Sequence, residues 1–133
     1  MYIFLDTNIV IDFLDSERPR HRIAEKLIQK IISTGYDLMI SEDMVSTIFY
    51  LIKNKQKTLQ QLEIIQEEWK IVHFGNIVIK NAIDLSFKNN LDLEDTLQCL
   101  CAKENDCDML ITSDKHFYNC GMKIQTASEF LND

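Results

Sequence analysis

The chain contains little glycine and proline, with three Gly and one Pro in 133 residues. It has no glycine-rich phosphate loop, which argues against nucleotide-hydrolase and dinucleotide-binding classes. No run approaches the roughly 18 apolar residues that a membrane span needs. An acid stands at position 6, where a secretory signal would carry basic residues. We therefore expect a cytoplasmic protein without a membrane-spanning segment.

The sequence also lacks a cysteine pattern for zinc or for a disulfide framework. Cys99, Cys101, Cys107 and Cys120 include no C-x-x-C pair, and Cys99 and Cys101 would point to different faces of a helix. We expect all four to be reduced thiols that pack as small apolar side chains. A hydrophobic content of 46% can fill one core without such links, so residues 1–133 are predicted to form a single domain.

Positive charge is scarce, and the net charge is −7. Residues 58–133 hold six Lys/Arg against thirteen Asp/Glu, whereas residues 1–57 hold eight of each. Overall charge therefore cannot hold a polyanion, and a nucleic-acid substrate would need a local basic patch, a metal ion or a second subunit. Two clusters are candidates for the patch, although ordinary solvated loops would look the same: Arg18, Arg20 and Arg22, and Lys53, Lys55 and Lys57.

Short apolar runs alternate with segments of helical periodicity along the whole chain. The runs predict strands at residues 2–5, 38–40, 70–73, 109–111 and 123–125. This alternation predicts a three-layer α/β/α fold, with a central parallel sheet of about five strands and right-handed crossovers.

Helix starts are less sharply marked than strands. We expect Thr58 to cap one helix, with Leu59, Leu62 and Ile65 as its buried stripe.

Three acids stand at places where a strand or loop gives way to a helix. Asp6 follows the first predicted strand, Asp114 follows the fourth, and Asp95 opens a helix beside Glu94. Because the carboxyl ends of parallel strands meet at one edge of a sheet, these acids can converge. Mg²⁺ and Mn²⁺ bind carboxylate oxygens supplied by different elements. A simpler interpretation makes Asp6, Glu94 and Asp95 helix-terminal acids and lets Asp114 hold a turn.

The order and local sequence of these acids resemble those of PIN domains, the nuclease family best known from VapC-type toxins. The resemblance covers the whole chain and depends on three runs together: Asp6-Thr7-Asn8, Glu94-Asp95-Thr96, and Thr112-Ser113-Asp114. It implies that Asp6, Asp95 and Asp114 are catalytic metal ligands and that Asn8 and Ser113 orient ligands.

The same resemblance implies an activity and a set of partners. RNA would be hydrolysed with Mg²⁺ or Mn²⁺, leaving a 5′-phosphate and a 3′-hydroxyl, and the ion rather than a protein base would activate the attacking water. An antitoxin protein and a second copy of the chain are the implied partners.

One position departs from the family pattern. PIN domains usually carry an acid early in the helix after the second strand, and Thr47 stands there. Asp43, one turn earlier, or Glu94, beside Asp95, would supply the missing carboxylate, unless each is only a first-turn helix acid.

The hypothesis from sequence is therefore a metal-dependent endoribonuclease. The alternative is a catalytically weakened PIN fold that binds RNA or protein, which Thr47 favours. A haloacid-dehalogenase-type phosphotransferase would need an acid at Asn8. A response-regulator receiver would need an Asp after the third strand, where His73-Phe74-Gly75 stands.

Overall fold

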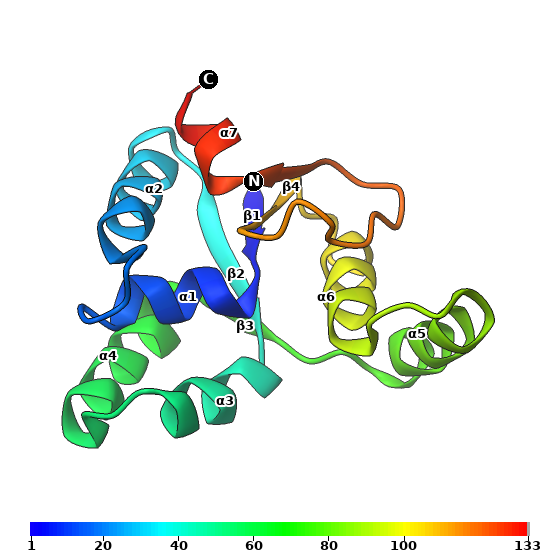
Figure 1. Cartoon of the computed structure of the whole chain (residues 1–133), viewed down its shortest axis with the longest axis horizontal. Coiled ribbons are helices and arrows are strands. Elements are labelled where there is room, and N and C mark those ends of the chain that lie inside the picture. The colour runs from blue at the N-terminus through cyan, green and yellow to red at the C-terminus, as the bar shows by residue number, and fades with distance from the viewer. Residues whose placement is uncertain (133) are drawn as a thin grey trace.

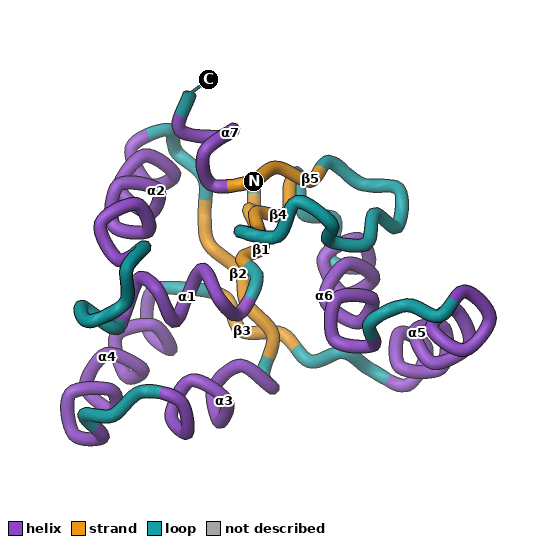
Figure 2. The backbone as a smooth tube through the Cα atoms, in the orientation of Figure 1, coloured by secondary structure: helices purple, strands orange, loops and turns teal. Residues whose placement is uncertain are grey.

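The central sheet has five parallel strands in the order β3-β2-β1-β4-β5. The structure is a computed structural model that describes residues 1–132. Figure 2 shows the strands running through the middle of the molecule. The predicted strands are confirmed, and their ends differ by no more than one residue from these bounds: β1 (Tyr2–Leu5), β2 (Asp37–Ser41), β3 (Lys70–Val72), β4 (Met109–Thr112) and β5 (Ile124–Thr126).

Helices cover both faces of this sheet, which confirms the three-layer architecture. In Figure 1, α1 to α4 lie on one side of the sheet and α5 and α6 on the other, while α7 packs on α2. No helix within residues 1–132 is long and apolar enough to cross a membrane. The helices are α1 (Thr7–Leu14), α2 (His21–Ser33), α3 (Asp43–Leu51), α4 (Lys55–Glu68), α5 (Asn76–Asn89), α6 (Leu93–Glu104) and α7 (Ala127–Leu131).

The two central strands form the core of the sheet. Ile3, Phe4 and Leu5 of β1 and Leu110 and Ile111 of β4 are 0% exposed. A parallel strand covered by helices on both faces must be apolar on both faces, so it reads as a continuous apolar run. This is why β1 and β4 are the clearest strands in the sequence.

The strand order reverses between β1 and β4. From β1 the chain moves outward through β2 to β3, and the next crossover returns it to β4 on the other side of β1. Connections leave the two strands in opposite directions, which opens a crevice at their carboxyl ends. Leu5 pairs with Ile111 in the parallel register, and the backbone N–H of Asp6 donates to the Ile111 carbonyl at 3.0 Å.

The expected start of α4 is wrong by one turn. Asn54 is the N-cap, and its side chain accepts a hydrogen bond from the Lys57 backbone N–H at 3.1 Å. Thr58 is buried inside the helix and donates to the Asn54 carbonyl at 2.7 Å. Leu59 is 49% exposed. Both residues are good caps, and the sequence alone does not say which one the packing selects.

The expectation of four reduced thiols is also wrong for one pair. Cys99 and Cys120 form a disulfide with their Cα atoms 6.0 Å apart, which joins α6 to the loop of residues 113–123. A separation of 21 residues gives no sign that this loop folds back onto α6. Cys101 and Cys107 are free, and burial raises their thiol pKa values to about 11 and about 12.

Candidate functional site

Asp6 lies at the end of β1, beside the end of β4. The residue is 6% exposed, and its carboxylate accepts a hydrogen bond from Thr112 Oγ1 at 2.7 Å. Asp6 occupies the N-cap position of α1, but its side chain makes no capping hydrogen bond. Burial raises its pKa, with smaller contributions from the charges of Glu94 and Asp114, although hydrogen bonds from Thr112 and the Thr7 backbone oppose the rise. The carboxylate therefore sits in a costly position that helix capping does not explain.

Asp95 lies in the first turn of α6, where the capping role belongs to another residue. Asp92 is the N-cap, and its side chain accepts the Asp95 backbone N–H at 3.0 Å. Burial, followed in decreasing order by the charges of Asp92, Asp6, Asp114 and Glu94, raises the pKa of Asp95 to about 7. A helix N-terminus normally favours a carboxylate. At Asp95, burial and the neighbouring acids together outweigh that preference.

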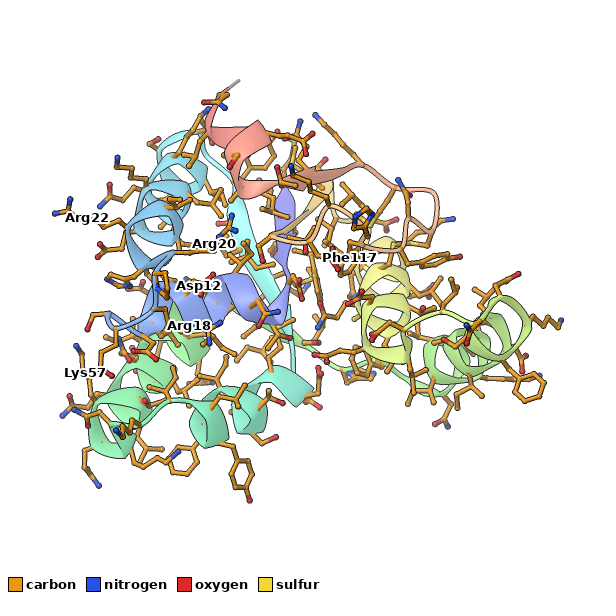
Figure 3. The ribbon with its side chains drawn as sticks, viewed as in Figure 1. Asp12, Arg18, Arg20, Arg22, Lys57 and Phe117 are labelled. Carbon is orange, nitrogen blue, oxygen red and sulfur yellow. A yellow bond between two sulfur atoms is a disulfide. The ribbon has the colours of Figure 1, made fainter. Side chains whose placement is uncertain are left out.

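Asp114 follows β4 and has two roles. One carboxylate oxygen accepts the His116 backbone N–H at 2.8 Å, and its own backbone N–H donates to Thr112 Oγ1 at 3.1 Å. The turn predicted by the simpler interpretation is thus present. The Asp114 charge also acts on Asp6 and Asp95. Phe117, labelled in Figure 3, is buried in the core and anchors this loop.

Glu94 is tied to the end of β1 by a residue that sequence reasoning missed. Its Oε1 atom accepts hydrogen bonds from Thr7 Oγ1 and from Gln98 Nε2, each at 3.2 Å. Gln98 is 0% exposed and also donates from Nε2 to Thr7 Oγ1 at 2.8 Å. The available signal was its position four residues after Glu94, which places both side chains on one face of α6.

The start of α3 does not join this group of acids. The Asp43 carboxylate accepts a hydrogen bond from the Ser41 hydroxyl, and Thr47 Oγ1 donates to the Asp43 carbonyl at 3.1 Å. Asp43 is not among the charges that raise the pKa of Asp6 or of Asp95. Both residues thus satisfy their side chains within their own segment.

The two residues expected to orient ligands are less constrained. Asn8 is exposed and Ser113 is half-buried. Neither side chain makes a hydrogen bond to another of residues 1–132. They lie beside Asp6 and Asp114 only by their places in the chain.

The four acids Asp6, Glu94, Asp95 and Asp114, here called the acid group, have no cationic partner. The ion pairs found in residues 1–132 are Arg18 with Asp12 and His21 with Glu25. As the side chains lie, no three Asp, Glu, His or Cys within that range are close enough together to hold one metal ion. Their donor chemistry nevertheless suits a hard divalent cation, which prefers carboxylate oxygens and would relieve the repulsion within the group.

The predicted basic patches are only partly free to bind a polyanion. Arg18 Nε lies 2.9 Å from the buried Asp12 carboxylate, and Figure 3 shows the two side by side. Lys55 Nζ donates to three carbonyls at the end of α3, including that of Ile52 at 2.8 Å. The remaining members of the two clusters are exposed: Arg20, Arg22, Lys53 and Lys57.

A family model and a curated relative both match nearly the whole chain and indicate the same family. The PIN domain family model matches residues 3–121. Ribonuclease VapC1 of Aquifex aeolicus (strain VF5) is 32% identical over 132 residues, which cover 96% of this chain and 92% of that protein.

Solved structures share the fold. The chain is similar to Mycobacterium tuberculosis VapC20, described as a Sarcin-Ricin loop cleaving toxin, with a TM-score of 0.72, 13% identity and coverage of 90% and 95%. It is also similar to a chain of a toxin-antitoxin complex from Klebsiella pneumoniae, with a TM-score of 0.72, 20% identity and coverage of 94% and 97%. At these identities the likeness is one of fold.

Proposed function

The chain belongs to the PIN domain family, and from this premise we propose that it is an endoribonuclease that hydrolyses RNA phosphodiester bonds with the help of Mg²⁺ or Mn²⁺. The main support is the acid group at the topological switch point between β1 and β4, where burial and the neighbouring carboxylates raise the pKa of Asp6 and of Asp95. A relative that is named a ribonuclease and matches nearly the whole chain supports the same activity.

We assign roles from the family resemblance and from the charges that act on Asp6 and Asp95. Asp6, Asp95 and Asp114 hold the divalent ion as catalytic residues, and Glu94 is a further metal ligand. When bound, such an ion polarises the scissile phosphate and lowers the pKa of water. Asn8 and Ser113, next to two of these acids in the chain, orient ligands or RNA.

We further propose that the protein is the toxin of a toxin-antitoxin pair. VapBC complexes from Haemophilus influenzae and Salmonella typhimurium have chains of the same fold, which supports an antitoxin as partner. We also propose a homodimer, as the family resemblance implies, and the exposed Ile83 and Phe87 on α5, 51% and 91% accessible, offer an apolar surface for a partner. An RNA substrate and an antitoxin would be met in the cytoplasm, which is the location that we propose.

A binding module without catalysis is the second candidate, and Thr47 is the observation that favours it. We infer that Glu94 rather than Asp43 compensates for Thr47, because the charge of Glu94 acts on both Asp6 and Asp95 and that of Asp43 acts on neither. Glu94 does offer a carboxylate near Asp6. These observations support an active site whose fourth acid comes from α6 instead of α3.

The decisive experiment is a Mn²⁺ titration with end-labelled RNA. We expect cleavage that requires Mn²⁺ or Mg²⁺ and stops with EDTA, with 5′-phosphate ends on the products. Asp95→Asn should abolish cleavage, and the matched control Asp106→Asn, at an exposed acid outside the group, should retain it. RNA binding without cleavage at any metal concentration would support the binding module instead.

A further inference from the structure

Gln98 is a buried amide with an unusual arrangement of partners. Its side chain is 0% exposed, and its Oε1 atom has no hydrogen-bond partner among residues 1–132. Burying an unpaired amide oxygen destabilises a protein, whereas an apolar side chain of similar size would pack there without that cost. Stability therefore does not explain a glutamine at this position.

The orientation of this amide is set by Glu94. Gln98 Nε2 lies 3.2 Å from Glu94 Oε1 and 2.8 Å from Thr7 Oγ1. If the amide were rotated by half a turn, its oxygen would face a carboxylate oxygen, which can only accept hydrogen bonds when ionised. The NH₂ group must face the carboxylate, so the unpaired carbonyl follows from the contact with Glu94.

Thr7, Gln98 and Glu94 form a closed triangle of hydrogen bonds, in which Gln98 donates to both of the others and Thr7 donates to Glu94. The Thr7 hydroxyl accepts from Gln98 and can then give its single proton to Glu94 Oε1, 3.2 Å away. Both donors bind the same carboxylate oxygen, so Glu94 Oε2 is left for another ligand. Thr7 directly follows Asp6 in the chain, and the triangle therefore fixes the carboxylate of Glu94 relative to that of Asp6.

We propose that Gln98 is a positioning residue that, together with Thr7, holds the Glu94 carboxylate beside Asp6 as the acid that α3 does not supply at Thr47. This proposal rests on the proposed metal-dependent function and identifies what makes its fourth carboxylate usable. An exposed Glu side chain would otherwise be spread over many rotamers. Mutating a residue that hydrogen-bonds a metal ligand without touching the metal usually lowers metal affinity or activity by about 10–100-fold.

The test uses Gln98→Met, which keeps the volume and removes both hydrogen bonds. We expect Mn²⁺ affinity, measured by calorimetry, to fall by about tenfold, while the metal-free variant melts at the wild-type temperature or above it. Gln61→Met is the matched control, because Gln61 also has an unpaired buried amide oxygen and donates to α1, but to its far end at Leu14. Its Mn²⁺ affinity should not change.

A double-mutant cycle separates positioning from packing. In a Glu94→Gln background, Gln98→Met should cause no further loss of Mn²⁺ affinity, because the group that it positions has already lost its charge. Additive losses, or a Gln98→Met protein that melts lower but binds Mn²⁺ as the wild type does, would overturn the positioning role and leave the proposed function intact. A wild-type protein that binds no Mn²⁺ would overturn the proposed function itself.

Discussion

The two sides of the crevice at the end of β1 contain similar residues in opposite situations. On the β4 and α6 side, Asp6 and Asp95 have raised pKa values because they are buried and surrounded by like charge. On the α3 side, the carboxylate of Asp43 is bound by Ser41, and the hydroxyl of Thr47 is bound to its own helix.

The difference lies in where the partners come from. The α3 side is satisfied by residues two and four positions away in the chain. The acid group is assembled from β1, α6 and the end of β4, and a disulfide joins two of those segments. Acids that repel one another without an ion pair indicate a place where a cation adds stability, whereas acids with local partners indicate a helix start.

The largest expected difference between the two sides is in RNA cleavage after one acid on each side is replaced by Asn. Asp6→Asn should abolish RNA cleavage, a loss in rate of at least about 100-fold. Removing a metal ligand should lower activity at least as much as removing a residue that only hydrogen-bonds a ligand. Asp43→Asn should stay close to wild-type activity. Initial rates with labelled RNA at saturating Mn²⁺ would measure both. Equal losses in the two variants would contradict the division between the sides.

The next largest expected effect is a loss of stability when the disulfide is removed. The bond supports the acid side alone, since neither of its cysteines lies on the α3 side. Cys120→Ser should lower the free energy of unfolding by about 3 kcal/mol, the cost expected when a loop of about 20 residues is no longer closed. The bond joins α6, which carries Asp95, to the loop that carries Asp114. Urea unfolding with and without dithiothreitol would measure this difference.

The same samples provide the control. In the reduced wild type, which is the form that a reducing cytoplasm favours, Mn²⁺ affinity should fall, whereas reduction of Cys120→Ser should change nothing. If the urea midpoint of the wild type is the same with and without dithiothreitol, the disulfide contributes no stability.

The sequence was informative wherever the physical cause is local. β1 and β4 could be predicted because strands buried on both faces need apolar residues throughout. The placement of Asp6 and Asp114 followed from the rule that parallel strands end at one edge. For Asp95 the same argument used the start of a helix instead of the end of a strand, and the family resemblance supported it.

The features that were missed depend on packing between distant segments. The Cys99–Cys120 bond requires the loop after β4 to return to α6. The contacts of Gln98 depend on Thr7, 91 residues earlier, whose Oγ1 accepts from Gln98 Nε2 at 2.8 Å. Asn54 replaced Thr58 as the cap of α4 because tertiary contacts decide between two residues of similar capping strength.

A smaller effect concerns the pH dependence of the metal-free protein. The pKa of Asp95 is raised from 3.8 to about 7 in the folded state, and that of Asp6 is raised as well. Between these pH values the folded protein keeps protons that the unfolded chain has lost, so stability is highest at low pH and falls as pH rises through about 7. The melting temperature in EDTA should therefore decrease from pH 5 to pH 8.

Two controls test whether the acid group causes this pH dependence of the melting temperature. Asp95→Asn should flatten the pH dependence because it removes the main titrating group. Saturating Mn²⁺ should reverse the slope, since metal binding favours the ionised carboxylates. A melting temperature in EDTA that rises over this range would show that the acids are not held in the repulsive arrangement described.

The smallest expected effect comes from restoring an acid on the α3 side. Thr47 is half-buried and its hydroxyl bonds the Asp43 carbonyl at 3.1 Å, so Thr47→Glu exchanges a local hydrogen bond for a carboxylate near the crevice. If Glu94 already serves as the fourth acid, Mn²⁺ affinity should change by less than about tenfold, because affinity rises with the number of charged ligands only while coordination positions remain open. Combining Thr47→Glu with Glu94→Ala decides the matter in one calorimetric series. Recovery of affinity in the double variant, compared with Glu94→Ala alone, means that the two positions are interchangeable sources of one carboxylate. Loss without recovery means that α3 no longer faces the ion, and the acid from α6 is then a requirement of this chain.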